Sequence, residues 1–188
     1  MYEETTHVPL ILHCPELFPT EKRIDSFVQH IDLVPTISDL LGLKYQPEEY
    51  DGQNLLPLIQ QKVDSIREHV FIEESYVQKK SALRTQKYKY ITARENDGWC
   101  NYCQKVHVGK EELYDLENDP GENQDITQQE KSIAKQMNHE LLKIINDLDE
   151  KREATIKKNK HSTKDDINIH DPQAEALIRK RFKNLGYL

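Results

Sequence analysis

Short apolar runs that end at turn residues characterise the first third of this chain. Residues 8–14 form an almost uninterrupted apolar run closed by Pro15, and residues 26–31 are expected to form a second short strand. A run like that of residues 8–14 is typical of a strand buried on both faces of a parallel sheet. Asp32 is expected to cap a helix that tolerates Pro35 in its first turn and stops at Gly42.

The middle of the chain is rich in β-branched and aromatic residues that partly alternate with polar ones. Residues 69–76 and 81–92 show this pattern and predict antiparallel strands of a small sheet. Residues 112–116 predict another strand, which the Asp-Pro-Gly sequence at 119–121 ends with a turn. Residues 97–110 are expected to form an irregular loop or hairpin.

A helical pattern follows, beginning with Thr127-Gln128-Gln129-Glu130, the sequence of a capping box. We expect this helix over residues 127–149, because apolar residues recur there at steps of three and four, as in a helix that packs on one face. These residues are Ile133, Met137, Leu141, Ile144, Ile145 and Leu148. Residues 157–170 resemble a polar linker, and Asp171-Pro172 is expected to open a last helix that docks back on the protein.

Several segments repeat, in order, the sequence features of one enzyme family. They read YEETTHVPLI at 2–11, IDLVPT at 31–36, LLGL at 40–43, DGQNLLPL at 51–58, LRT at 83–85, KYKYI at 87–91, ELYDLENDP at 112–120 and LGYL at 185–188. Together they resemble the C-terminal half of a sulfatase of the alkaline-phosphatase-like superfamily. The resemblance covers nearly the whole chain.

This resemblance implies an α/β fold and an activity. Residues 1–60 would be the C-terminal part of the sulfatase catalytic α/β domain and would finish its sheet. Residues 61–156 would form a small α+β subdomain, an antiparallel sheet with a packed helix, and residues 157–188 would be a polar linker and a terminal docking helix. The implied reaction is the hydrolysis of a sulfuric ester, with a sulfated small molecule or glycan as substrate.

The catalytic groups that the resemblance implies are not found in this sequence. Sulfatases make a formylglycine nucleophile from a Cys/Ser-x-Pro-x-Arg motif, whereas Cys14-Pro15-Glu16 has its proline one place early and no arginine follows. No Asp-Asp or Asp-His-Gly sequence near a strand end suits the divalent cation, usually calcium. The family's catalytic lysine would lie a few residues before Tyr2. We expect a truncated or split product that is inactive alone and whose partner is the missing N-terminal catalytic half.

Two residues are candidates for contact with substrate. His7 follows closely on the position of that missing lysine, so its imidazole could reach sulfate oxygens; the alternative is a structural histidine at a strand edge. Trp99, together with Tyr102, could form a wall on which a sugar stacks. The alternative for Trp99 is simple packing under its loop.

Cys100, Cys103 and His107 form a competing pattern. A Cys-x-x-Cys pair with a nearby histidine is common in zinc knuckles, but a closed zinc site needs a fourth ligand, which His69 or His161 would have to supply. The alternative is two ordinary cysteines in an irregular loop. Two further functions stay open: a phosphodiester or phosphonate monoester hydrolase of the same superfamily, and a non-enzymatic zinc-binding module.

Charge and composition narrow the choice of partners. The 188 residues carry a net charge of −7, and 31% of them are charged. This acidic balance, without clustered Lys and Arg, argues against a nucleic-acid or anionic membrane surface. No run approaches the roughly 20 apolar residues that span a bilayer. We therefore expect neither nucleic acid nor membrane as a partner, and the compartment stays open.

Overall fold

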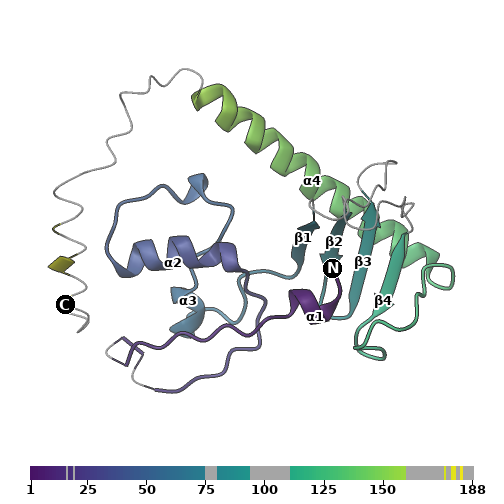
Figure 1. Cartoon of the computed structure of the whole chain (residues 1–188), viewed down its shortest axis with the longest axis horizontal. Helices are drawn as coiled ribbons and strands as arrows, with labels where there is room; N and C mark the ends of the chain where they lie inside the picture. Colours follow the sequence, from purple (N-terminus) through teal and green to yellow (C-terminus); the bar gives the residue numbers. More distant parts are fainter. Residues whose placement is uncertain are drawn as a thin grey trace, which may run out of the picture. The chain divides into compact units, whose positions relative to one another are not determined.

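The structure is a computed structural model that describes residues 1–15, 17–18, 20–74, 80–93 and 111–159, and the single positions 176, 179, 180 and 183. The chain forms two compact units (Figure 1). The first unit consists of Met1–Pro9 and Glu68–Asn159, and the second of Leu10–Arg67 and Lys160–Leu188. Most of the expected linker and last helix lie outside the described residues, although the four single positions are helical.

A four-stranded antiparallel sheet forms the centre of the first unit. Its strands lie side by side in chain order: β1 Val70–Glu74, β2 Lys80–Arg84, β3 Tyr88–Ala93 and β4 Glu112–Asp115. The strands expected near 69–76 and 112–116 are thus confirmed. Residues 81–92 form a hairpin, because the Thr85 N–H donates to the Tyr88 carbonyl at 2.8 Å and the Thr85 hydroxyl accepts the Tyr88 N–H at 3.0 Å.

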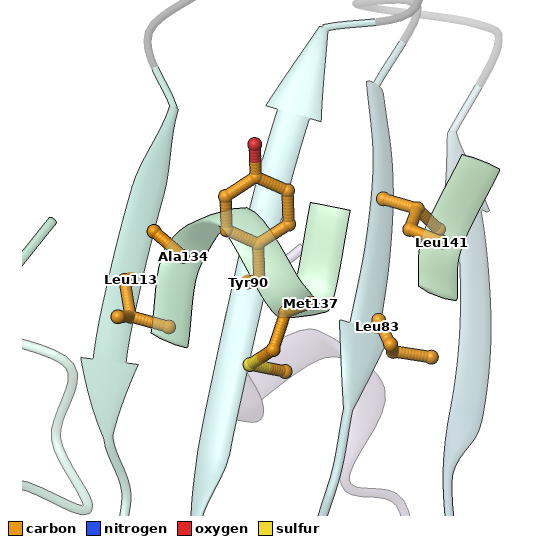
Figure 2. Close-up of a cluster of buried hydrophobic side chains, with 6 residues drawn as sticks. All are labelled: Leu83, Tyr90, Leu113, Ala134, Met137 and Leu141. Atoms are coloured by element: carbon orange, nitrogen blue, oxygen red, sulfur yellow. The ribbon is translucent and has the colours of Figure 1, made fainter. Parts of the chain in front are cut away.

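Helix α4, Lys131–Asn159, covers one face of this sheet. Three side chains of the helix and three of the strands make the core, as Figure 2 shows: Ala134, Met137, Leu141, Leu83, Tyr90 and Leu113. Ile133, Ile144 and Ile145 pack against this cluster, as the apolar stripe predicted. Burying one large apolar side chain contributes about 1.5–3 kcal/mol, so this interface stabilises both the sheet and the helix. The prediction of a small antiparallel sheet with a packed helix is confirmed.

Helix α4 begins later than the sequence predicted. Residues 127–129 form a turn, and the helix starts only at Lys131. The Thr127 hydroxyl donates to the carboxylate of Asp125, which also accepts the Leu113 N–H of β4 at 3.2 Å. The threonine side chain therefore ties this turn to the sheet edge, and the prediction of a capping box was wrong. The helix also continues past the predicted end at 149 to Asn159.

The N-terminal segment covers the opposite face of the sheet. A second buried cluster lies on that face and consists of Ala82, Ile91, Tyr114 and Leu116, with Met1 and Ile72 packed against it. The short helix α1, Glu3–Thr6, lies over the same strands (Figure 1). Residues at the start of the chain and residues more than 80 positions later are thereby brought into contact.

Short helices form the second unit. They are η1 His30–Asp32, α2 Leu33–Leu40, η2 Pro47–Glu49 and α3 Leu56–Ile59. Helix α2 carries Pro35 in its first turn and ends before Gly42, whose φ of 66° lies in the left-handed region that glycine adopts without strain. The predicted helix and its C-terminal stop are confirmed.

The two strands expected in this part of the chain are not formed. Residues 8–14 and 26–29 have irregular structure, and His30 already belongs to η1. Side chains of the first run are exposed, Ile11 by 84% and Val8 by 66%. A strand needs a neighbouring strand to bond its N–H and C=O groups, and within residues 8–14 the structure pairs none. The prediction of a strand buried on both faces at residues 8–14 was therefore wrong in both respects, and the strand expected at residues 26–31 was wrong as well.

Candidate functional site

A buried group of charges lies beneath the N-terminal helix of the first unit. Lys89 of β3 is fully buried, because it points to the face opposite α4, where α1 covers it. Its Nζ lies 2.9 Å from Glu3 Oε1 and 2.9 Å from Glu122 Oε1. A buried ammonium without counter-charges would be costly, so these two carboxylates are what allows a lysine at this position.

Glu3 is the centre of this group, which we call the Glu3 cluster: Glu3, Arg84, Lys89 and Glu122. Both carboxylate oxygens of Glu3 accept hydrogen bonds from the Arg84 guanidinium, each at 3.3 Å. Burial opposes ionisation of Glu3, but the hydrogen bonds from Lys89 and Arg84, together with their positive charges, outweigh it, so that the pKa of Glu3 is lowered. The carboxylate is thus held ionised and in one orientation.

Glu122 closes the cluster from the turn after β4. Its carboxylate accepts the backbone N–H of Glu3 at 2.6 Å through Oε2, while Oε1 meets Lys89 as an ion pair rather than as an aligned hydrogen bond. Glu122 has a φ of 52°, unusual for a residue with a side chain, and its N–H donates to the Asp119 carbonyl at 3.1 Å. The turn predicted at 119–121 is confirmed, and it places this carboxylate.

His7 lies at the outer edge of the Glu3 cluster. It follows the last turn of α1, where its N–H donates to the Glu3 carbonyl at 2.8 Å. Its Nδ1 lies 3.4 Å from Glu3 Oε2, and its side chain is 77% exposed. The alternative of a histidine at a strand edge is not what the structure shows, because the described residues after His7 form no strand. Contact of His7 with substrate stays a prediction.

Two tyrosines and a lysine surround a second carboxylate on the same face of the sheet. Glu112 Oε2 accepts the hydroxyls of Tyr2 at 2.8 Å and Tyr114 at 3.0 Å, and Lys80 lies 3.3 Å from Oε1. Burial, followed by the nearby Glu112 carboxylate, raises the pKa of both tyrosines. These hydroxyls are therefore donors, and they fix the start of the chain on β4.

Asp32 organises the second unit through a buried carboxylate. Oδ2 accepts the Gln29 N–H at 2.7 Å and Oδ1 accepts the Gln53 N–H at 2.8 Å, while the Arg67 guanidinium donates to Oδ1. Asp32 was expected to cap α2, but its side chain makes no bond to that helix. It bonds instead to the η1 cap and to two distant loops, so the cap prediction is corrected.

The sequence segments IDLVPT and DGQNLLPL meet at this carboxylate. The Thr36 hydroxyl donates to the Asp32 carbonyl at 2.6 Å and accepts the Leu55 N–H at 2.9 Å. At Gly52 an added Cβ would lie 2.1 Å from the Ile31 carbonyl oxygen, so the turn fits only without a side chain. Close packing and these hydrogen bonds thus account for the residue types at Asp32, Thr36 and Gly52.

The remaining candidates lie outside the described residues: Trp99, Cys100, Cys103 and His107. Sugar stacking by Trp99 and zinc binding by the two cysteines and the histidine stay predictions. Within the described parts of the chain, no three His, Cys, Asp or Glu side chains are grouped as metal ligands. Among the described helices, none combines the length and the apolar character needed to cross a bilayer.

Comparison with known proteins gives one family and a set of relatives. The family model described as N-sulphoglucosamine sulphohydrolase, C-terminal, matches residues 1–148. The chain is 28% identical over 145 residues to an ulvan-active sulfatase of Formosa agariphila, covering 63% of this chain and 28% of the relative. It is 30% identical over 139 residues to a Δ4,5-hexuronate-2-O-sulfatase of Bacteroides thetaiotaomicron, covering 69% of this chain and 26% of the relative.

Solved structures give the same kind of partial match. A putative sulfatase YidJ of Bacteroides fragilis superposes with a TM-score of 0.46 at 21% identity, covering 61% of this chain and 24% of that structure. The chain thus spans little more than a quarter of the length of the two curated relatives named above, 28% and 26%.

Proposed function

We propose that this chain completes an enzyme that hydrolyses sulfate esters of sugars. The chain belongs to the sulfatase family and corresponds to the C-terminal part of its members. The observation that carries the proposal is the match of the family model over residues 1–148. The sugar substrate is supported by the relative whose name specifies a sulfated hexuronate. Fold alone would not assign a function, so the proposal depends on this family match.

The chain alone is proposed to be inactive. Its sequence contains no Cys/Ser-x-Pro-x-Arg motif, so that it lacks the residue from which the family nucleophile is made. Calcium, with oxygen ligands, would bind in the rest of the enzyme and would stabilise the charge of the sulfate group. The catalytic N-terminal half is therefore the proposed partner.

An apolar groove in the second unit supports such a partner. Its volume is about 820 Å³, and described side chains between positions 10 and 28 and between positions 55 and 60 line it. Leu10, Ile11 and Leu12 border this groove and are all exposed, Ile11 by 84%. A contiguous apolar surface of this kind marks a site of contact. We assign it to the catalytic half, which would supply the strands that residues 8–14 lack.

The N-terminal segment is the part of this chain that we place at the substrate. In the family, the catalytic lysine lies a few residues before the tyrosine that Tyr2 matches. Tyr2 and Glu3 are both fixed on the sheet, through Glu112, Lys89 and Glu122. His7, exposed beside Glu3, would then donate a hydrogen bond to a sulfate oxygen. Such a bond strengthens as negative charge develops in the transition state.

Release of sulfate from sulfated sugars tests the proposal. The polypeptide that carries this chain together with an N-terminal catalytic segment is incubated with mono- and disaccharides sulfated at single positions, and free sulfate is measured by ion chromatography. We expect sulfate release that calcium chelation abolishes, and none from the isolated chain. Hydrolysis of phosphodiesters or phosphonate monoesters in place of sulfate esters would instead identify the other branch of the superfamily.

A further inference from the structure

We infer that Glu3 is a positioning residue for His7: the buried side of the Glu3 cluster fixes the carboxylate, which holds the imidazole through Nδ1 and leaves Nε2 facing outward. This inference rests on the proposed function for its role in catalysis, but its geometry belongs to the first unit alone. The structure joins His7 to Glu3 at 3.4 Å and Glu3 to the fully buried Lys89 at 2.9 Å.

The Glu3 carboxylate is a rigid acceptor. Lys89 and Arg84 bind Oε1, and Arg84 also binds Oε2, the oxygen next to the imidazole. The backbone of the same residue is fixed too, because its N–H donates to Glu122 at 2.6 Å. A carboxylate held at both ends has little freedom to follow a neighbour, so His7 adapts to Glu3 and not the reverse.

This arrangement selects one nitrogen of the imidazole. An ionised carboxylate only accepts hydrogen bonds, so a hydrogen bond between the two side chains requires an N–H of His7, and the nitrogen that lies at 3.4 Å from the carboxylate is Nδ1. Nε2 is then the nitrogen left for another molecule. In a neutral imidazole it offers a lone pair, and in a charged one it donates an N–H to an anion such as a sulfate oxygen. A carboxylate that orients a histidine through its second nitrogen serves the same purpose in many active sites.

Ring nitrogen chemical shifts test the orientation in the isolated chain. The chain is labelled with ¹⁵N-histidine and measured at a pH of about 9, where an ordinary imidazole, with a pKa of about 6.5, is neutral. We expect the Nδ1–H tautomer for His7, whereas a free imidazole prefers Nε2–H. This measurement needs no variant. An Nε2–H tautomer of His7 in the unmodified chain would overturn the inference.

A charge-removing variant adds a directional test. In Glu3→Gln, Lys89 Nζ and Arg84 Nε, which are donors only, take the amide oxygen at the Oε1 position. The amide NH₂ then occupies the Oε2 position and faces His7, so that a hydrogen bond between them requires Nδ1 to accept. We expect the tautomer to switch to Nε2–H. The matched control is Glu4→Gln, an exposed residue of the same helix, which should leave His7 unchanged. Equal tautomers in Glu3→Gln and the unmodified chain would refute the role of Glu3.

A double-mutant cycle in the longer enzyme tests the consequence for turnover. Glu3→Gln should lower sulfate release per folded molecule by roughly tenfold, the lower end of the 10–100-fold effects of such orienting partners. In the His7→Ala background the same change should have no further effect, because Glu3 acts through His7. Effects that multiply would overturn the inference. If the unmodified enzyme releases no sulfate, the proposed function fails, and the tautomer measurement still decides the orientation.

Discussion

Replacing Lys89 by methionine tests whether the buried charges hold the N-terminal segment on the sheet. Methionine keeps most of the length and apolar stem of lysine and removes only the ammonium. The change leaves Glu3 with the Arg84 guanidinium, at 3.3 Å from both oxygens. Glu122 is affected more strongly than Glu3. Its side chain is only 2% exposed, and its remaining hydrogen bond in the cluster comes from the Glu3 N–H.

The cost follows from this asymmetry. Removing one partner of a buried ion pair typically destabilises a protein by about 3–5 kcal/mol, because a charge is left buried without its counter-charge. Lys89 and Glu122 fit that case, with 0% and 2% of their side chains exposed. A total stability of about 5–15 kcal/mol is usual, so Lys89→Met should remove a large share of it. Adding Glu122→Gln should restore more than about 1 kcal/mol by neutralising the stranded carboxylate.

Urea unfolding of the isolated chain measures these changes in the free energy of unfolding. The helical circular-dichroism signal, to which α4 contributes, is recorded as the urea concentration rises. The matched control is Lys87→Met, two positions earlier on the same segment. Its side chain is 42% exposed, and its partners Asp115 and Glu117 lie 3.9 and 3.5 Å away. An exposed pair of this kind contributes about 0–1 kcal/mol. If Lys89→Met costs no more than Lys87→Met, or if Glu122→Gln adds to its cost, the cluster does not hold the segment as described.

Two further predictions concern pH and a tight turn. The pKa of Glu3 in the folded chain is lowered below the ordinary 4.5, so the ionised carboxylate contributes its full stabilisation above pH 4.5 and loses it as the pH falls through the folded pKa. Between pH 7 and 3, the melting temperature should therefore fall less steeply in Glu3→Gln than in the unmodified chain. Gly52→Ala should destabilise the second unit by about 1–3 kcal/mol, because the new Cβ would lie 2.1 Å from the Ile31 carbonyl oxygen. In the control Gly121→Ala, the close neighbour of the new Cβ is the movable side-chain amide of Asn123, and Asp119 Oδ1 lies at an ordinary 3.9 Å. Hydrogen exchange at Leu55 should therefore become faster in Gly52→Ala alone.

Local patterns in the sequence were sufficient to predict much of the fold. The stripe that includes Met137 and Leu141 predicts the buried face of α4, because contacts within a helix and its periodicity depend on residues three and four apart. Gly42 likewise stops α2 through its own backbone conformation. The expected strand at residues 8–14 failed for the opposite reason. An apolar run shows that a segment tends to be buried, but the neighbour that would pair with it is not specified locally.

The Glu3 cluster could not be predicted from local patterns, although one signal for it was present. Glu3 and Lys89 are separated by 86 positions, so no spacing rule connects them. Lys89 does, however, share a face of β3 with Ile91, which is buried and two residues further on. A lysine on a buried face requires a carboxylate partner, and the acidic Tyr2-Glu3-Glu4 segment was available. The sequence feature attributed to the enzyme family, YEE before VPLI, therefore has a second explanation: its first glutamate fixes the segment that leads toward His7 on the small sheet.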